Sequence, residues 1–145
     1  MSLYLIDTSC MVAAVCSWHQ HHAVTRAELQ RLQQARWRPV IAGHSLAEAY
    51  SVLTRLPTPR RLSPSDALAL VSQNWRQARV AVLAPPDYWR LLQACKAEGI
   101  AGGQLYDALI AACGRRAGAR AILTLNPDHF RRVGVSAELL VPGRL

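Results

Sequence analysis

The feature that most constrains this chain is the alternation of short apolar segments with longer segments of helical periodicity. Strands joined through helices favour an α/β fold, here a three-layer sandwich with a mainly parallel central sheet flanked by helices. A chain of 145 residues that is 51% hydrophobic is typical of a single domain, residues 1–145, with one core. The expected strands are residues 3–6, 39–42, 80–83, 121–125 and 139–141. The expected helices are residues 8–16, 23–35, 45–56, 63–77, 85–98 and 104–117.

Neither a membrane protein nor a disulfide-stabilised protein is expected. No apolar run approaches the roughly 20 residues that a membrane-spanning helix needs. The first apolar run has no basic residue before it and is interrupted at Asp7, so we expect no signal peptide and a cytoplasmic location. None of the four cysteines forms a C-x-x-C pair, and we interpret them as reduced core residues. His19, His21 and His22 have no partnering cysteine and are interpreted as a solvated loop or helix start rather than a metal site.

The charge balance favours a polyanionic partner. The chain carries 17 basic residues, 16 of them arginines, against nine acids, which gives a formal charge of +8. Arginine suits phosphate because its planar guanidinium can bind two oxygens at once. A biased genome composition would explain arginine in place of lysine, but it would not create net charge. Nucleic acid is therefore the expected partner.

The nine acidic residues divide into five with ordinary structural explanations and four without. Asp7 and Asp128 lie just past expected strands, while Glu48 and Asp107 lie among apolar residues of expected helices. Burying an unpaired carboxylate costs several kcal/mol, so each of these four needs a partner. Polar helix faces, helix caps and element ends explain the other five. Those five are Glu28, Asp66, Asp87, Glu98 and Glu138.

Two explanations for the four remaining acids stay open on the residues alone. Arginine pairing would explain any one of them, and Asp7 would also serve as the N-cap of the helix that follows it. A shared metal would explain all four at once, and oxygen ligands without cysteine suit magnesium or manganese. Two such ions are a recurring device for phosphodiester hydrolysis, because one activates water and both stabilise the developing charge.

Four segments of the chain contain these acids in a recognisable order. They are LIDTSCMVA, GHSLAEAYSVLTRLP, GGQLYDALIAA and ILTLNPDHF. In this order and spacing they resemble the acidic motifs of PIN-domain ribonucleases, and more closely those of the VapC toxins of bacterial toxin–antitoxin pairs. The resemblance covers nearly the whole chain. It implies a PIN-like fold and a magnesium- or manganese-dependent endoribonuclease that hydrolyses RNA phosphodiester bonds.

The resemblance also implies residue roles and partners. Asp7, Glu48 and Asp107 would be the metal ligands. Ser9 would orient the carboxylate of Asp7 or the water near it. A small antitoxin would occupy the active-site groove, and the chain would form a homodimer. The arginines expected to help hold the RNA, which are paired near the ends of expected elements, are Arg60, Arg61, Arg115 and Arg116.

The fourth acidic position departs from the family pattern. The family commonly has Asp or Asn after the last core strand and a second Asp directly before Phe. Here Asn126 takes the first place, and His129 stands directly before Phe130. Asp128 is displaced by one residue. Either Asn126 or Asp128 would complete the site, by direct contact with the metal or through water.

Other functions fit the sequence less well. A catalytically inert PIN-like module that binds RNA or protein is the alternative, and the presence of all four acids argues against it. A phosphotransfer enzyme of the haloacid-dehalogenase type needs a second aspartate where Ser9 stands. A P-loop is excluded because no G-x-x-x-x-G-K-[ST] segment occurs, and a serine hydrolase lacks its G-x-S-x-G segment.

Overall fold

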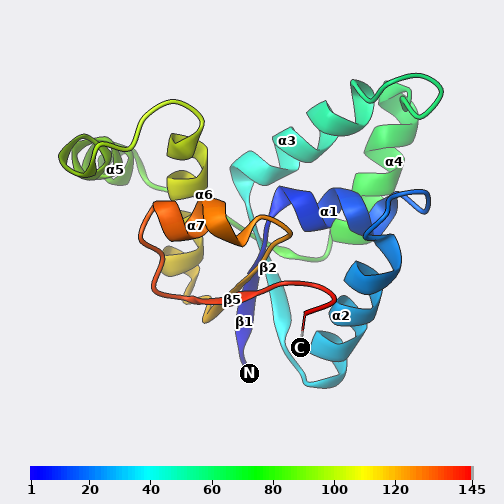
Figure 1. Cartoon of the computed structure of the whole chain (residues 1–145), viewed down its shortest axis with the longest axis horizontal. Helices are drawn as coiled ribbons and strands as arrows, with labels where there is room; N and C mark the ends of the chain where they lie inside the picture. The colour runs from blue at the N-terminus through cyan, green and yellow to red at the C-terminus, as the bar shows by residue number, and fades with distance from the viewer. Residues whose placement is uncertain (145) are drawn as a thin grey trace.

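A sheet of five parallel strands forms the middle layer of the computed structural model, which describes residues 1–144 (Figure 1). The first strand lies at its centre, because it pairs with the second strand on one side and with the fourth on the other. Parallel strands need crossover connections, and helices supply them here. The order across the sheet is β3 (Arg79–Ala81), β2 (Arg38–Ala42), β1 (Leu3–Ile6), β4 (Ala121–Leu123) and β5 (Glu138–Leu140).

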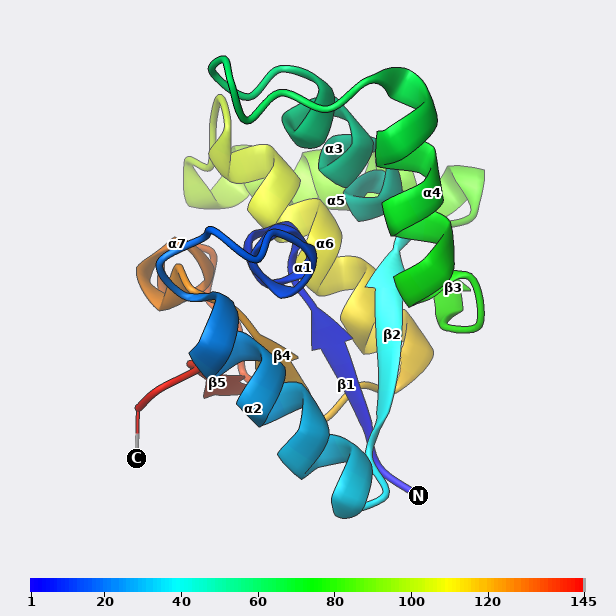
Figure 2. The same cartoon turned by 90° about the vertical axis from the view of Figure 1, so that its right-hand side faces the viewer.

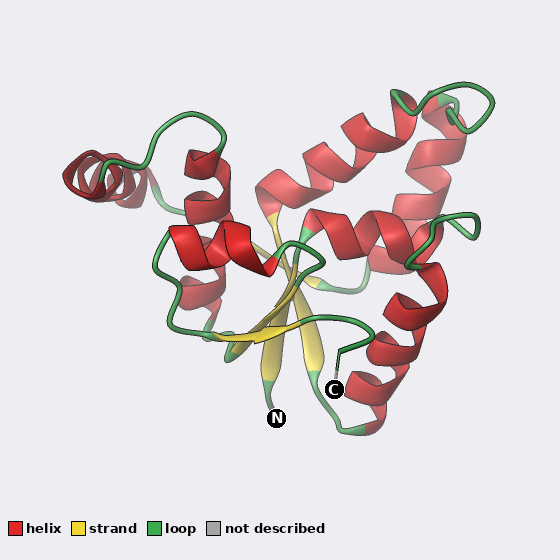
Figure 3. Cartoon of the chain, in the orientation of Figure 1, coloured by secondary structure: helices red, strands yellow, loops and turns green. Residues whose placement is uncertain are grey.

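Alternate residues of β1 point to opposite faces of the sheet, and both faces are buried. Tyr4 and Ile6 belong to one hydrophobic cluster, and Leu5 belongs to another. Helices cover both faces, which confirms the expected three-layer α/β fold (Figure 3). The first face packs against α1 (Thr8–Val15), α2 (His22–Gln34), α3 (Gly43–Thr54) and α4 (Pro64–Trp75). The second packs against α5 (Pro85–Glu98), α6 (Gln104–Ala117) and α7 (Pro127–Arg132).

Element boundaries lie within two residues of those expected, but one helix was not expected. The strand expected over residues 121–125 ends at Leu123, and α7 begins at Pro127. Proline suits the first turn of a helix, because its φ is already helical and its missing N–H would have had no helical partner. The residue at position 145, which the single-domain expectation includes, lies outside the described residues.

The starts of several helices gather at the carboxyl end of the sheet. Figure 2 shows the arrowheads of β1 and β2 pointing towards α1, α3 and α6. α1 follows β1 with only Asp7 between them as its N-cap, and α3 follows β2 directly. Ligands of open α/β sheets bind at the carboxyl ends of the strands, so the fold predicts a binding site at this end of the sheet.

Two further expectations concerned the cysteines and membrane-spanning helices. The four cysteines are free and buried, as expected. Among the helices formed by residues 1–144, none has the length and apolar character needed to cross a membrane.

Candidate active site

A cavity of about 690 Å³ lies at the carboxyl end of the sheet and contains three of the four candidate acids. Asp7 reaches it from the end of β1, Glu48 from α3 and Asp107 from the first turn of α6. Ser9 and Asn126 line it as well. Its other polar lining residues are Thr8, His19, Gln20, His21, Gln104, Tyr106, His129 and Arg132.

Asp7 is fixed by hydrogen bonds to both of its carboxylate oxygens. Its Oδ1 accepts from the backbone N–H of Thr8 at 2.8 Å, so the N-cap role considered from the sequence is confirmed. Its Oδ2 accepts from the hydroxyls of Ser9 and Thr124, both at 2.9 Å. Only 7% of the Asp7 surface is exposed, so these three bonds supply most of what water would otherwise provide.

The two hydroxyls that hold Asp7 are themselves anchored to the segment after β4. Ser9 Oγ accepts from the backbone N–H of Leu125 at 3.1 Å, and Thr124 Oγ1 accepts from that of Asn126 at 2.9 Å. Each hydroxyl therefore has an acceptor for its proton and a donor for its oxygen. This network ties the start of α1 to the residues that lead into α7. Sequence reasoning missed Thr124, because a threonine at the end of a strand gives no signal beyond strand propensity.

The electrostatics of Asp7 are those of a carboxylate that lacks a counter-charge. Burial, which is the largest effect, raises the pKa of Asp7, and the negative charge of Glu48 raises it further. The hydrogen bonds from Thr124, Ser9 and Thr8 act in the opposite direction without cancelling the shift. The site thus holds Asp7 in place at a cost in free energy when no cation is bound.

Glu48 lies on α3 one turn after His44. Its Oε2 accepts a hydrogen bond from His44 Nε2 at 2.7 Å. The imidazole of His44 in turn stacks on Tyr106 of α6, with ring centroids 4.8 Å apart and planes 6° from parallel. The carboxylate of Glu48 is therefore positioned by a contact between the two helices that carry Glu48 and Asp107.

Asp107 is half-buried in the first turn of α6. Burial raises its pKa first, and the charges of Asp7 and Glu48 raise it further, whereas His129 and Arg132 lower it. His129 Nδ1 lies 4.0 Å from Asp107 Oδ1. The charges of Asp7 and Glu48 therefore reach Asp107, as expected for side chains that line one cavity.

The structure places Asp128, which the sequence predicted as a catalytic metal ligand, outside the lining of the cavity. Its side chain is 74% exposed and accepts from Arg131 at 2.6 Å on the outer surface of α7. The helical start at Pro127 turns Asp128 outwards, while Asn126 and His129 line the cavity. Of the two residues left open by the sequence, Asn126 is the one that lines the cavity.

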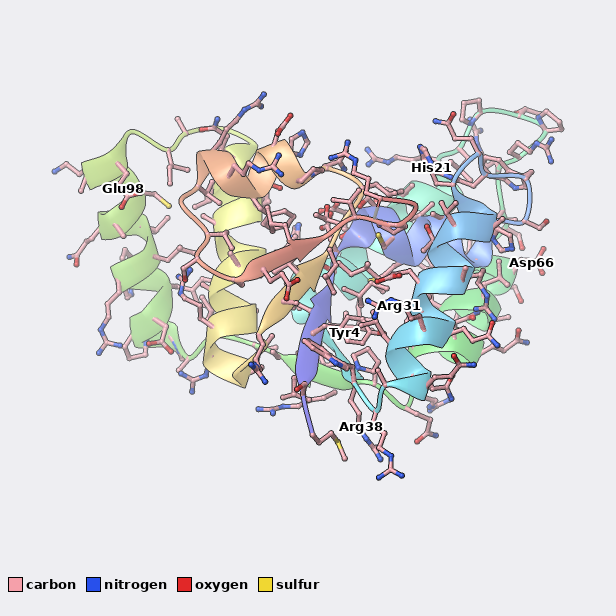
Figure 4. The ribbon with its side chains drawn as sticks, turned by 60° about the horizontal axis from the view of Figure 1, so that its bottom comes forward. Tyr4, His21, Arg31, Arg38, Asp66 and Glu98 are labelled. Atoms are coloured by element: carbon pink, nitrogen blue, oxygen red, sulfur yellow. The ribbon has the colours of Figure 1, made fainter. Side chains whose placement is uncertain are left out.

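The acids with ordinary explanations lie elsewhere, as expected. None of the five lines the cavity. Glu28 pairs with Arg31 at 2.6 Å. Figure 4 shows Asp66 and Glu98 at opposite margins of the molecule, where α4 begins and α5 ends.

The four arginines expected to hold RNA lie in two separate parts of the molecule, and none of the four lines the cavity. Arg60 and Arg61 lie in the loop between α3 and α4, where the Arg60 guanidinium sits 5.1 Å from the ring centroid of Trp18. Arg115 and Arg116 lie in the last turn of α6, about 12 Å along the helix from Asp107. The arginine that does line the cavity is Arg132, which the sequence did not single out.

The chemistry of the donor set fits a hard divalent cation. Three carboxylates and the amide oxygen of Asn126 line one cavity, without a cysteine. Within residues 1–144, however, no three side chains of His, Cys, Asp or Glu lie close enough together to coordinate one metal ion in this conformation. In this conformation Glu48 is bonded to His44, and Asp107 faces His129. Burial, followed by the charges of neighbouring acids, raises the pKa values of Asp7 and Asp107, so both carboxylates are costly to keep ionised and a cation would reduce that cost.

Comparisons with known proteins point to one family. The family described as PIN domain matches residues 4–136. Ribonuclease VapC40 of Mycobacterium tuberculosis is 31% identical over 137 residues, which cover 92% of this chain and 96% of that protein. Ribonuclease VapC27 of the same organism is 34% identical over 132 residues, covering 90% and 91%.

Solved structures share the fold at lower sequence identity. VapBC2 from Rickettsia felis, bound to a promoter DNA fragment, has a TM-score of 0.70 at 18% identity and covers 96% of this chain and 98% of its own. DNA-bound VapBC from Salmonella typhimurium has a TM-score of 0.69 at 18% identity, with coverage of 97% and 98%. VapC20 of Mycobacterium tuberculosis, described as a sarcin–ricin-loop-cleaving toxin, has a TM-score of 0.62 at 17% identity, with coverage of 82% and 86%.

Proposed function

Because the chain belongs to the PIN-domain family, we propose that it is a metal-dependent endoribonuclease and the toxin of a VapBC-type toxin–antitoxin pair. The observation that carries the proposal is the convergence of Asp7, Glu48 and Asp107 on one cavity at the carboxyl end of a parallel sheet. Relatives at 31% and 34% identity over nearly the whole chain are named as ribonucleases, which supports the same reaction here.

Asp7, Glu48 and Asp107 would hold the divalent cation, magnesium or manganese, with Asn126 as a further oxygen donor. When bound, the ion would activate water for attack on a phosphodiester and offset the charge that develops on the phosphate. Asp7 is already oriented for this task by Ser9 and Thr124.

Positive charge around the cavity suits a phosphodiester substrate. Arg132 lines the cavity, where its guanidinium would bind a phosphate oxygen beside the scissile bond. Arg60 and Arg61 would contact the RNA backbone from the loop between α3 and α4. Arg115 and Arg116 would do so only if the RNA extends to the far end of α6. The net charge of +8 would draw RNA to the whole surface in a salt-dependent way.

The structural neighbours also support a proposal about partners. The similar structures from Rickettsia felis and Salmonella typhimurium are VapBC complexes, in which the toxin-like chain is paired with a second protein. We propose that a small antitoxin binds this chain, covering the cavity, and that the chain forms a homodimer. Co-purification of the protein encoded by a neighbouring reading frame would test the first of these.

The experiment that tests the activity compares two acid-to-amide variants with a matched control. Asp7→Asn and Asp107→Asn are expected to reduce RNA cleavage in magnesium or manganese by about 100-fold or more, since each removes a ligand charge. Asp128→Asn makes the same change at an exposed side chain outside the cavity and should cleave as wild type does.

Calorimetric titration with manganese separates metal binding from cleavage. Wild type and Asp128→Asn are expected to bind manganese alike, and the Asp7 and Asp107 variants to bind it more weakly. Cleavage that persists in EDTA would contradict the metal role. A wild-type protein that binds manganese and RNA but cuts no RNA would favour the inert PIN-like binding module instead.

A further inference from the structure

A stacked pair of aromatic rings lies beside the proposed metal ligand Glu48, and the exposed face of its tyrosine has no part in the proposed hydrolysis. Tyr106 of α6 lines the cavity immediately before Asp107 in the chain. His44 of α3 covers one face of the Tyr106 ring, nearly parallel to it. Tyr106 nevertheless remains 50% exposed, which for a ring covered on one side leaves its other face and edge accessible.

The orientation of this ring is fixed in advance. His44 is held by its hydrogen bond to Glu48 at 2.7 Å, and the parallel stack transmits that orientation to Tyr106. A flat, exposed ring that is already ordered loses little conformational freedom when a second ring stacks on it. Base–aromatic stacking is the usual means by which proteins bind single-stranded nucleic acid.

We propose that Tyr106, backed by His44, stacks on an unpaired base of the RNA next to the phosphate that is cut. This inference rests on the proposed ribonuclease function and assigns the contact with the base next to the cut to Tyr106. The base must be free to present its face, so the cut would fall in a single-stranded or looped segment. A base inside a duplex is already stacked on both sides and cannot reach Tyr106 without being extruded.

The surroundings of the pair suit such a substrate. Arg132 lines the same cavity and would hold the phosphate, while the stacked pair would hold the adjacent base. Trp18, whose neighbour His19 lines the cavity, is 40% exposed and has Arg60 over its ring. Exposed rings beside cations are typical of surfaces that bind single-stranded nucleic acid.

The experiment measures RNA binding and cleavage separately. Cleavage assays with the wild-type protein first identify the shortest single-stranded RNA that is cut and the position of the cut. Binding of that RNA is then measured by fluorescence anisotropy in the inactive Asp7→Asn background. Tyr106→Ala is expected to weaken binding by about 5- to 150-fold, the range for loss of one base–aromatic stack. Tyr106→Phe, which keeps the ring, should bind as tightly as the parent.

Abasic nucleotides identify the base that Tyr106 contacts. One abasic position next to the cut should weaken binding by the same factor as Tyr106→Ala, and the two changes together should cost no more than either alone. Tyr88→Ala, which removes a 44% exposed tyrosine on α5, is the matched control and should leave binding unchanged. The same RNA annealed to its complement should bind less tightly than the single strand, and Tyr106→Ala should weaken it no further.

Two results would overturn the inference while leaving the ribonuclease proposal intact. In the first, the wild type cleaves the RNA, but the binding loss from Tyr106→Ala multiplies with the binding loss from every abasic position, so that no single base accounts for the effect of Tyr106. In the second, a duplex is bound and cut as well as the single strand. Manganese affinity that falls in Tyr106→Phe as well as in Tyr106→Ala would also count against base stacking, because it would assign the hydroxyl of Tyr106 to positioning of the acids. If the wild type cuts no RNA, the ribonuclease proposal fails, and this inference fails with it.

Discussion

Replacing Asp7 by asparagine is expected to stabilise the metal-free protein while abolishing its activity. Asp7 is 7% exposed, and burial outweighs its three hydrogen bonds in setting its pKa. Asparagine has nearly the same shape and no charge, and its single oxygen can still cap α1, but its amide group gives the Ser9 and Thr124 hydroxyls no acceptor. Removing the imperfectly compensated buried charge is worth about 1–3 kcal/mol in the free energy of unfolding. The acceptor lost to the two hydroxyls offsets part of this gain, so a net stabilisation of about 1 kcal/mol is expected.

The pH dependence of this difference follows from the direction of the pKa shift. Because burial raises the pKa of Asp7 above its ordinary value of about 3.9, the folded state holds the proton more tightly than the unfolded state does. The free energy of unfolding of wild type should therefore fall as the pH rises from about 4 through the raised pKa. Below that window Asp7 is protonated in both states, and the advantage of Asp7→Asn should largely disappear.

Urea unfolding in EDTA, followed by tryptophan fluorescence at pH 7 and near pH 4, measures this difference; Trp75 is buried and should report the transition. Asp128→Asn is the control, since it removes an exposed carboxylate and should change stability by less than about 0.5 kcal/mol. Manganese at about 100 times its Kd should then stabilise wild type by about 2.7 kcal/mol and Asp7→Asn by much less. The reasoning is refuted if Asp7→Asn is less stable than wild type at pH 7 in EDTA, or if the difference is equal at both pH values.

Two further changes test the network around Asp7 and the packing behind it. Thr124→Val removes a buried hydroxyl that donates to Asp7 at 2.9 Å and should cost about 1.5–3 kcal/mol at pH 7, whereas Thr124→Ser should stay near wild type in the same urea assay. Gly114→Ala places a methyl group 3.5 Å from Leu5, an ordinary contact, and should raise the free energy of unfolding by about 0.5–1 kcal/mol through helix propensity. Gly118→Ala makes the same change at a φ of +79° and should lower it by about 1 kcal/mol, so equal effects at the two glycines would contradict the account.

The fold was predictable because its elements are short and their patterns are local. Apolar runs of three to five residues gave the strands, and helical spacing gave most helices to within two residues. α7 was missed because its six residues are too few to show a helical period. Its signal lies instead in the Asn126–Pro127 pair, which places a proline at the first helical position.

The site was predictable only where it depends on strand ends and helix faces. Asp7 follows β1 directly, at the end of the sheet where ligands bind. The apolar residues around Glu48 and Asp107 predict that these helix faces pack against the core, so a shared cavity was expected. The contact between His44 and Tyr106 joins residues 62 positions apart. Tertiary packing sets such a contact, and no local pattern encodes it.

The two interpretations of Asp7, helix cap and metal ligand, are compatible because its oxygens have separate partners. Oδ1 caps α1 through Thr8, and Oδ2 is held by the hydroxyls of Ser9 and Thr124. Capping alone does not explain an acid here, since asparagine or serine caps as well without burying a charge. The carboxylate carries a cost that its hydrogen bonds do not cancel, and the proposed cation would offset that cost. An aspartate at this N-cap therefore serves both the cap and the two hydroxyls, and it fits the proposed cation site.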